Sequence, residues 1–217
     1  MSNAVVLYTD HGFGSPYAMS AYVALAEKNV EVELIKVDLA HHAQHHPDYL
    51  KLSITGKVPT LVHDRFALSE SSAIAEYIDE IFPGTALYPR DERERARARQ
   101  VQAWLRTDLG ALREERSSDT LFKKPAHPLP SLSAPARQAA DKLIAAAEQL
   151  LPQGSDELFG HWSIADFDLS LMLNRMVAVG DPVPTRLVNY VRHQWNRPSV
   201  RRWVALDREN APSRSAA

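Results

Sequence analysis

The hydrophobic and polar positions of residues 4–34 follow three successive patterns. Residues 4–8 form a continuous apolar run, which is typical of a strand buried on both faces. Ser15 and Pro16 then predict the start of a helix that extends to about Lys28, because serine is a favoured N-cap and proline suits the first helical turn. The alternation V-E-V-E-L over residues 30–34 predicts a second strand. A right-handed crossover would make the two strands parallel.

Residues 41–82 predict one more helix–strand–strand–helix unit. A weakly helical segment at 49–52 is followed by short strands at 60–62 and 66–68. These strands are separated by three residues, so they are expected to form an antiparallel hairpin. A helix then begins at Ser71 and directs Ile74, Ile78 and Ile81 toward a core. The order β-α-β-α-β-β-α predicts a mixed four-stranded sheet with helices against it.

The second half of the chain reads as helical throughout. Residues 83–90 contain two prolines and a glycine without periodicity, which indicates a linker. Helices are predicted at about 91–115, 134–151, 163–179, 185–195 and 199–208, and the proline-rich segment 117–133 is predicted as a loop. Ser163 and Asp166 form a variant capping box at the start of the helix predicted at 163–179. Apolar side chains occupy nearly the whole circumference of this helix. We therefore expect this helix at the centre of an all-helical domain.

Composition narrows the function classes. The 217 residues carry a formal net charge of −2, which gives no field to attract nucleic acid or anionic membranes. The absence of cysteine excludes disulfides, thiolate metal sites and a cysteine nucleophile. No apolar run approaches the roughly 18 residues of a membrane span, and the N-terminus lacks a basic leader. We expect a cytoplasmic protein without nucleic-acid or membrane partners.

Four motifs in order resemble the glutathione S-transferase family, in particular its bacterial serine-type members. They are Ser15-Pro16 after the first strand, Gly56-Lys57-Val58-Pro59, Glu70-Ser71 and Ser163-Ile164-Ala165-Asp166. Each is weak alone, but the resemblance covers nearly the whole chain. It implies a thioredoxin-like domain at 1–82, a linker at 83–90 and an all-helical domain at 91–217.

The resemblance implies that Ser15 donates a hydrogen bond to the glutathione thiolate. A helix N-terminus and a nearby donor lower a thiol pKa from about 8.5 into roughly the 3.5–7.5 range, and Ser15 is predicted at such a terminus. Tyr8 is a competing candidate, because some classes use a tyrosine near the end of the first strand.

The binding residues also follow from the resemblance. Val58, before a cis Pro59, would pair its backbone with the cysteinyl unit of glutathione. Glu70 and Ser71 would take the ammonium and the carboxylate of the γ-glutamyl end. The glycyl carboxylate is assigned to the pair Lys57 and Gln44. Many members carry histidine at the position of Gln44, so the neighbouring His45 is an alternative.

The function implied is transfer of glutathione to a small hydrophobic electrophile, with hydroperoxide reduction as a side activity, in detoxification or oxidative stress. Phe13 and Trp104 are guesses for the walls of the electrophile pocket, and a homodimer is expected. Glutathione is then the only co-substrate, and the histidines at 41–46 are predicted to lie in a polar loop without a metal. A glutathione-binding scaffold or chaperone without turnover is the alternative.

Overall fold

The computed structural model describes residues 4–123 and 125–210, with side chains described up to residue 206. Its sheet contains β1 (Val5–Asp10), β2 (Glu33–Val37), β3 (Thr60–His63) and β4 (Phe66–Ser69). The helices of this half are α1 (Pro16–Glu27), the 3₁₀ turn η1 (Ala43–His45), α2 (Pro47–Leu50) and α3 (Ser71–Ile81). The strand order is β2-β1-β3-β4, with β1 parallel to β2 and the other pairs antiparallel. The predicted element order and mixed sheet are confirmed.

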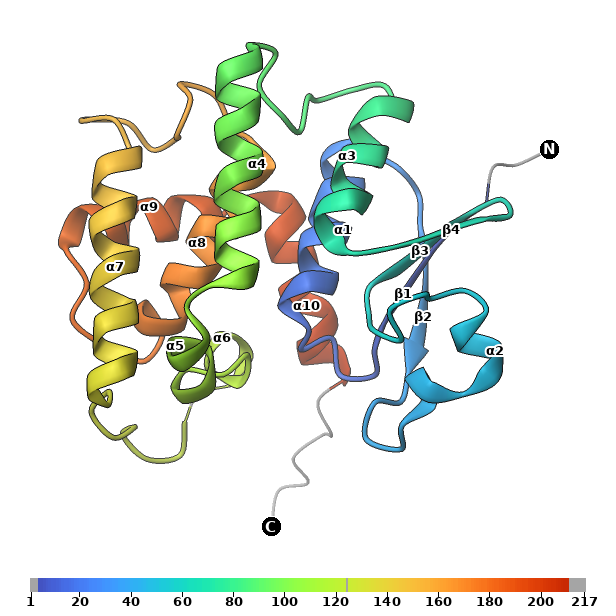
Figure 1. The fold of residues 1–217 in the computed structure, drawn as a ribbon, viewed down its shortest axis with the longest axis horizontal. Coiled ribbons are helices and arrows are strands. Elements are labelled where there is room, and N and C mark those ends of the chain that lie inside the picture. The colour runs from blue at the N-terminus through green and yellow to red at the C-terminus, as the bar shows by residue number, and fades with distance from the viewer. Residues whose placement is uncertain (1–3, 124, 211–217) are drawn as a thin grey trace.

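The rest of the described chain is helical, as predicted. It contains α4 (Glu92–Thr107), α5 (Gly110–Glu115), α6 (Asp119–Phe122), α7 (Ala134–Leu150), α8 (Ile164–Val177), α9 (Thr185–Trp195) and α10 (Pro198–Asn210). Figure 1 shows the strands and α2 on the right, α4, α7 and α9 on the left, and α1, α3 and α10 between them. None of the helices in the described ranges is long and apolar enough to span a bilayer.

Two strand predictions need correction. β2 begins at Glu33 rather than at residue 30. The reason is the exit from α1, where Asn29 has φ 55° and the Val30 N–H closes the turn onto the Leu25 carbonyl. Residues 30–32 are then used to cross from the helix to the sheet. β1 alternates between buried and half-buried side chains instead of being buried on both faces.

Three helix predictions also need correction. The helix expected over residues 91–115 is broken between α4 and α5, because Leu109 has φ 63° and its N–H bonds the Asp108 carboxylate. The segment 117–133, predicted as a loop, contains the short helix α6. Ile81, expected in the core, is 41% exposed in the last turn of α3.

The helix α8 forms the core of the helical domain, as its apolar pattern predicts. Most of its side chains are buried, and a capping box of Ser163 and Asp166 starts it. α8 packs on α4 and on α1, so it reaches the sheet-bearing domain as well. The terminal helix α10 also docks there, where Trp203 is fully buried and its indole Nε1–H donates to the Phe13 carbonyl at 3.0 Å. The two domains therefore share a packed interface.

Candidate functional site

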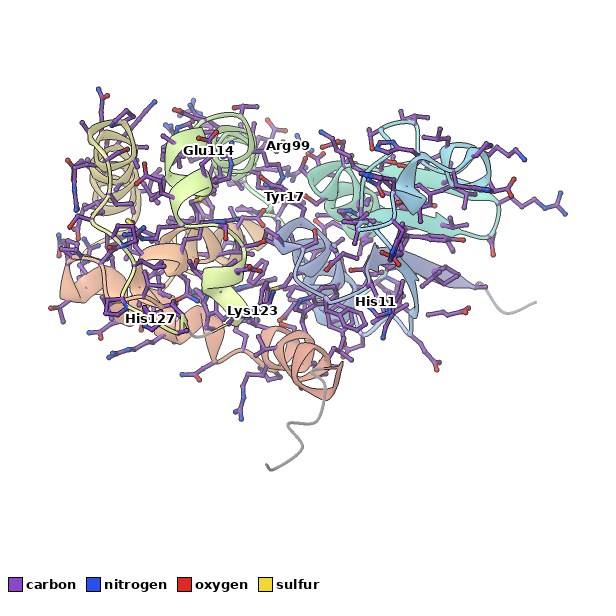
Figure 2. All side chains as sticks on the ribbon, turned by 90° about the horizontal axis from the view of Figure 1, so that it is seen from below. His11, Tyr17, Arg99, Glu114, Lys123 and His127 are labelled. Carbon is purple, nitrogen blue, oxygen red and sulfur yellow. The ribbon has the colours of Figure 1, made fainter. Side chains whose placement is uncertain are left out.

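A cavity of about 210 Å³ lies where α1, the loop before β3, the start of α3 and α4 meet. Its lining residues are Tyr17, Thr55, Lys57, Val58, Pro59, Glu70, Ser71 and Arg106. Lys57, Val58, Pro59, Glu70 and Ser71 are the five predicted binding residues that the fold brings together here. Figure 2 shows Tyr17 between the sheet-bearing domain and the helical domain. The cavity is thus built from both domains.

The loop before β3 is held by hydroxyl groups. The Lys57 carbonyl accepts hydrogen bonds from Tyr49 Oη at 2.8 Å, from Ser53 Oγ at 3.2 Å and from Thr60 Oγ1 at 3.2 Å. Gly56 has φ 60°, where a side chain would be strained and its Cβ would lie 3.3 Å from a Leu50 methyl. Burial raises the pKa of Tyr49, so its hydroxyl stays a donor. These contacts fix the backbone that leads to Val58.

The Val58–Pro59 peptide bond is cis, as the resemblance implies. Val58 is half-buried and Pro59 is buried where they line the cavity. Lys57 beside them is exposed, so its ammonium can reach an anion in the cavity.

The start of α3 supplies the opposite wall. Glu70 is the N-cap residue and has φ 72° and ψ 113°, a strained backbone for a residue with a side chain. Its exposed carboxylate is the acidic group among the lining residues. Ser71 follows as the first helical residue and is 2% exposed. The first N–H groups of a helix have no intrahelical partner and carry partial positive charge, so this end favours an anion.

Ser15 is the N-cap of α1, two residues before the lining residue Tyr17. Its Oγ accepts a hydrogen bond from the Ala18 N–H at 3.2 Å, so the hydroxyl hydrogen is available for another acceptor. Ser15 is half-buried and is not among the residues that line the cavity. The structure places its hydroxyl at the positive end of α1.

The turn before Ser15 is organised by Asp10, which sequence reasoning missed. The Asp10 carboxylate accepts the Gly14 N–H at 2.7 Å and the Ser15 N–H at 2.9 Å. The Thr9 hydroxyl donates to it as well. The available signal was the sequence Thr-Asp-His-Gly after the first strand, because aspartate commonly bonds backbone N–H groups of a following turn.

Two other predicted site residues lie near the cavity without lining it. Tyr8 packs edge-on against Tyr49, with ring centroids 5.7 Å apart, so its ring lies on the α2 side of the sheet. Gln44 lies in η1, and its side-chain oxygen is buried without a hydrogen-bond partner among the described residues. Its carbonyl is 3.6 Å from the position of a Cβ on Gly56, and the His45 ring lies 3.8 Å from the same point. Both candidates for the glycyl end thus lie beside the loop that carries Lys57.

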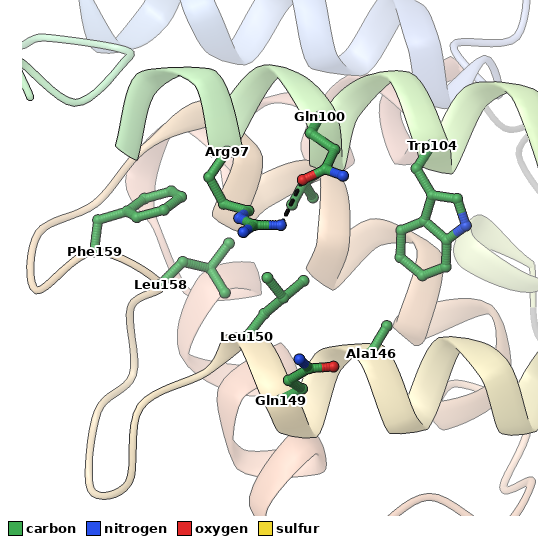
Figure 3. A pocket seen from close by; sticks show the side chains of 9 residues that line it. Arg97, Gln100, Trp104, Ala146, Gln149, Leu150, Leu158 and Phe159 are labelled. Carbon is green, nitrogen blue, oxygen red and sulfur yellow. Dashed lines mark hydrogen bonds between the residues drawn. The ribbon is translucent and has the colours of Figure 1, made fainter. Parts of the chain in front are cut away.

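Phe13 and Trp104, predicted as walls of the electrophile pocket, do not line this cavity. Phe13 is 3% exposed and packs edge-on against Trp203 at 5.4 Å, so its ring belongs to the core. Trp104 lines a separate cavity of about 420 Å³ between α4 and α7, with Leu150 and Phe159 among its neighbours (Figure 3). The cavity at Ser71 therefore has neither aromatic ring among its lining residues.

Arg106 on α4 is the second residue that sequence reasoning missed. Its Nε and Nη2 donate to Ser71 Oγ at 3.1 and 2.9 Å, and Nη2 also donates to Asp168 Oδ2 at 3.0 Å. Its guanidinium lies 5.8 Å from the centre of the Tyr17 ring. Asp168 is 62 residues away in the sequence, so no local pattern could have indicated this pair.

Family models match both domains. A model of the glutathione S-transferase N-terminal domain matches residues 5–80, and one of the glutathione S-transferase C-terminal domain matches residues 91–209. The chain belongs to the glutathione S-transferase family.

Curated relatives match over part of their length. Protein LigF of Sphingobium sp. is 34% identical over 90 residues, which cover 41% of this chain and 35% of that protein. Glutathione transferase GST 23 of Zea mays is 40% identical over 92 residues, covering 40% and 39%. A maleylacetoacetate isomerase of Pseudomonas aeruginosa is 37% identical over 109 residues, covering 49% and 50%. The matched segment thus spans half or less of each relative.

Solved structures match over nearly the whole chain. A glutathione transferase homologue from Burkholderia, with bound glutathione, is 43% identical and has a TM-score of 0.77, covering 95% of this chain and 99% of that one. A theta class glutathione S-transferase from Xanthomonas axonopodis pv. citri, with glutathione bound, has a TM-score of 0.76 at 22% identity and covers 93% and 97%. The second likeness shows the shared fold alone.

Proposed function

We propose that this protein is a glutathione transferase that binds glutathione along the cavity and activates its thiol at Ser15. The observation that carries the proposal is the convergence of Lys57, Val58, Glu70 and Ser71 on one cavity beside the N-terminus of α1. The glutathione-bound Burkholderia homologue, at 43% identity, supports it.

The charges of glutathione fit the lining residues. The peptide carries a carboxylate at each end and an ammonium beside the γ-glutamyl carboxylate. Lys57 would take the glycyl carboxylate, Glu70 the ammonium, and Ser71 with the α3 N-terminus the glutamyl carboxylate. The backbone of Val58 would pair with the cysteinyl unit as an added strand does. This orientation directs the sulfur toward the start of α1.

Ser15 would then stabilise the thiolate. Its hydroxyl hydrogen is free because Oγ already accepts the Ala18 N–H, and the α1 N-terminus adds partial positive charge. The thiolate attacks the electrophile and the new sulfur bond forms as the leaving group departs with its electron pair. Where the acceptor is a hydroperoxide, the thiolate attacks the terminal oxygen, the O–O bond breaks and an alcohol leaves. A second glutathione then reduces the resulting glutathione sulfenic acid, which gives glutathione disulfide and water. The chain has no cysteine, so it cannot form a protein–glutathione disulfide.

Three further expectations belong to this proposal. The domains are proposed to divide at 83–90, with residues 1–82 holding glutathione and the helical domain completing the electrophile pocket. The protein is proposed to be a homodimer paired through α3 and α4, which sedimentation velocity would test. A cytoplasmic role in detoxification or oxidative stress is also part of this proposal.

Steady-state conjugation of glutathione to an activated aryl chloride tests the mechanism. Ser15→Ala is expected to lower kcat by roughly 10- to 100-fold, the worth of one hydrogen bond to a charged group, with glutathione affinity changed only a few-fold. Ser15→Thr keeps a hydroxyl and should retain most of the rate. Full activity in Ser15→Ala together with a large loss in Tyr8→Phe would assign the thiolate to Tyr8 instead. Tight glutathione binding without turnover in the wild type would leave a binding scaffold.

A further inference from the structure

Arg175 on α8 is a buried cation without a carboxylate partner among the residues that the structure describes. Its side chain is 3% exposed, and its Nη1 donates to the Arg116 carbonyl at 2.8 Å. Arg116 is buried to the same degree, but its guanidinium is paired with the Asp181 carboxylate at 2.6 Å. Because charged side chains are seldom fully buried unless they are paired, the guanidinium of Arg175 indicates an anion that the described residues do not supply.

Arg113 on α5 is a second guanidinium of this kind. It is half-buried, and its Nη1 donates to the Leu105 carbonyl at 3.0 Å and to the Asp108 carbonyl. In both Arg113 and Arg175 the bonds start from Nη1, so Nε and Nη2 have no partner within the described part of the chain. The Nε of Arg175 is itself buried. An Nε–Nη2 edge carries two parallel N–H groups, a geometry that matches the two oxygens of a carboxylate.

The two guanidiniums are close enough to repel each other. Burial lowers the pKa of Arg175 to about 10, the neighbouring Tyr17 opposes this shift, and Arg113 adds to it. Arg175 therefore keeps its proton at pH 7, and two like charges lie together where burial weakens their screening by water. An anion bound between them would relieve this repulsion.

The contacts between α1 and α8 place Arg175 toward the start of α1. Asp168 on α8 accepts a hydrogen bond from Ser20 on α1 at 2.7 Å. Arg175 follows Asp168 on the same face of α8, about 10 Å further along the axis. Tyr17, which acts on Arg175, comes before Ser20 in α1, so the two helices pass each other in opposite directions. Arg175 thus lies toward the end of α1 that Ser15 caps.

Tyr17 connects this region to the proposed glutathione site. It lines the cavity of about 210 Å³ and lies between the two domains (Figure 2). Arg113 and Arg175 are therefore on the helical-domain side of the place where the proposed function puts the glutathione sulfur.

We propose that Arg113 and Arg175 bind a carboxylate of the second substrate, so that the electrophile used by this protein is an anion. The carboxylate would accept from the two unused Nε–Nη2 edges, and the reactive atom would face the sulfur at the start of α1. The inference rests on the proposed function, because it assumes that glutathione places its thiolate beside Ser15. It deepens that function by naming the chemical class of the substrate.

Both arginines also stabilise helix ends. Arg113 bonds carbonyls in the last turn of α4, and Arg175 belongs to the last turn of α8, where a cation is favourable. A side chain with this role alone would affect every substrate alike, whereas a carboxylate site affects only substrates that carry the carboxylate.

Two aryl chlorides of the same shape test the proposal by steady-state conjugation. 4-Chloro-3,5-dinitrobenzoate carries a carboxylate, and 4-chloro-3,5-dinitrobenzamide is its neutral counterpart. In both, the glutathione thiolate attacks the ring carbon that bears chlorine, a C–S bond forms, and chloride leaves with the electron pair of the C–Cl bond. Each kcat/KM is divided by the rate constant without protein. The wild type is then expected to favour the benzoate by roughly 10- to 100-fold, as for hydrogen bonds to a charged group.

Variants of the two arginines should remove this preference. Arg113→Met and Arg175→Met are each expected to lower kcat/KM for the benzoate by roughly 10- to 100-fold and to leave the benzamide within about twofold. Arg113→Lys keeps the charge without the planar fork and should retain only part of the preference. Arg113 is half-buried, so its variants decide the question if Arg175→Met does not fold. Arg97→Met removes an exposed cation of α4 that bonds Gln100, and it should change neither rate.

The outcomes separate this inference from the proposed function. If the wild type conjugates both compounds with equal corrected efficiency, or if the arginine variants lose activity on both alike, the carboxylate site is overturned while glutathione transfer stands. If the wild type conjugates neither compound, the proposed function fails and this inference fails with it.

Discussion

Asp166 makes the stability of the helical domain depend on pH. Its side chain is fully buried at the start of α8. It accepts hydrogen bonds from the Leu158 N–H at 2.7 Å, the Ser163 N–H at 2.9 Å, the Ser163 hydroxyl at 2.8 Å and the Tyr190 hydroxyl at 3.2 Å. These donors favour the carboxylate, but burial disfavours it more strongly, and the net effect raises the pKa of Asp166 from 3.8 to about 6.

The sign and size of the effect follow from linkage. Because the folded pKa lies above the unfolded one, the folded state binds the proton more tightly, and this contribution is complete below pH 3.8 and lost as pH rises through about 6. With pKa values of about 6 folded and 3.8 unfolded, Asp166 adds roughly 1 kcal/mol more to the free energy of unfolding at pH 5 than at pH 7.

Asp166→Asn removes the titration and should lower stability at every pH, since an amide cannot accept all four bonds. The test is the difference between wild type and variant in urea unfolding, followed by the fluorescence of the four tryptophans, which all lie beyond residue 90. That difference should grow by roughly 1 kcal/mol between pH 7 and pH 5. A constant difference, or one that shrinks on acidification, would refute the reasoning and mean that the four donors hold the folded pKa of Asp166 near its unfolded value.

Two half-buried carboxylates, Asp10 and Asp181, give further predictions about stability. Asp10→Ala leaves the Gly14 and Ser15 N–H groups without their acceptor, which should lower the free energy of unfolding by about 1–3 kcal/mol. The variant should also have a lower kcat, because the Ser15 backbone loses the group that anchors it. Unchanged turnover together with a reduced melting temperature would mean that Asp10 contributes to stability and not to catalysis. Arg116 is 2% exposed and pairs with Asp181 at 2.6 Å, so Arg116→Met should cost about 3–5 kcal/mol in thermal denaturation, and adding Asp181→Asn should recover part of that loss; no recovery would contradict the pairing.

Helices with strong local signals were predicted nearly to the residue. α7 was expected at 134–151 and spans Ala134–Leu150, because its apolar spacing and its capping serine act within a few residues of one another. The break at Leu109 was missed because leucines continue at helical spacing across it, and only the backbone angle of Leu109 changes. β2 was placed three residues early, since alternation does not indicate how many residues the chain needs to leave α1.

The residues of the cavity show the same difference between positions with a local sequence signal and positions without one. Lys57, Val58 and Ser71 belong to short motifs whose residues are neighbours in the sequence, so the resemblance could indicate them. Arg106 and Asp168 meet only because α4 and α8 pack together, and Arg106 follows a run of arginines that reads as a solvated helix face. Contacts that depend on tertiary packing leave no local pattern.

The most direct test of thiol activation at Ser15 is an ultraviolet titration of bound glutathione in the wild type and in Ser15→Ala. The account predicts a thiolate absorption band that appears below neutral pH in the wild type and moves to higher pH in the variant. Tight glutathione binding with an unshifted thiol pKa in both proteins would contradict it and leave a protein that binds glutathione without activating it.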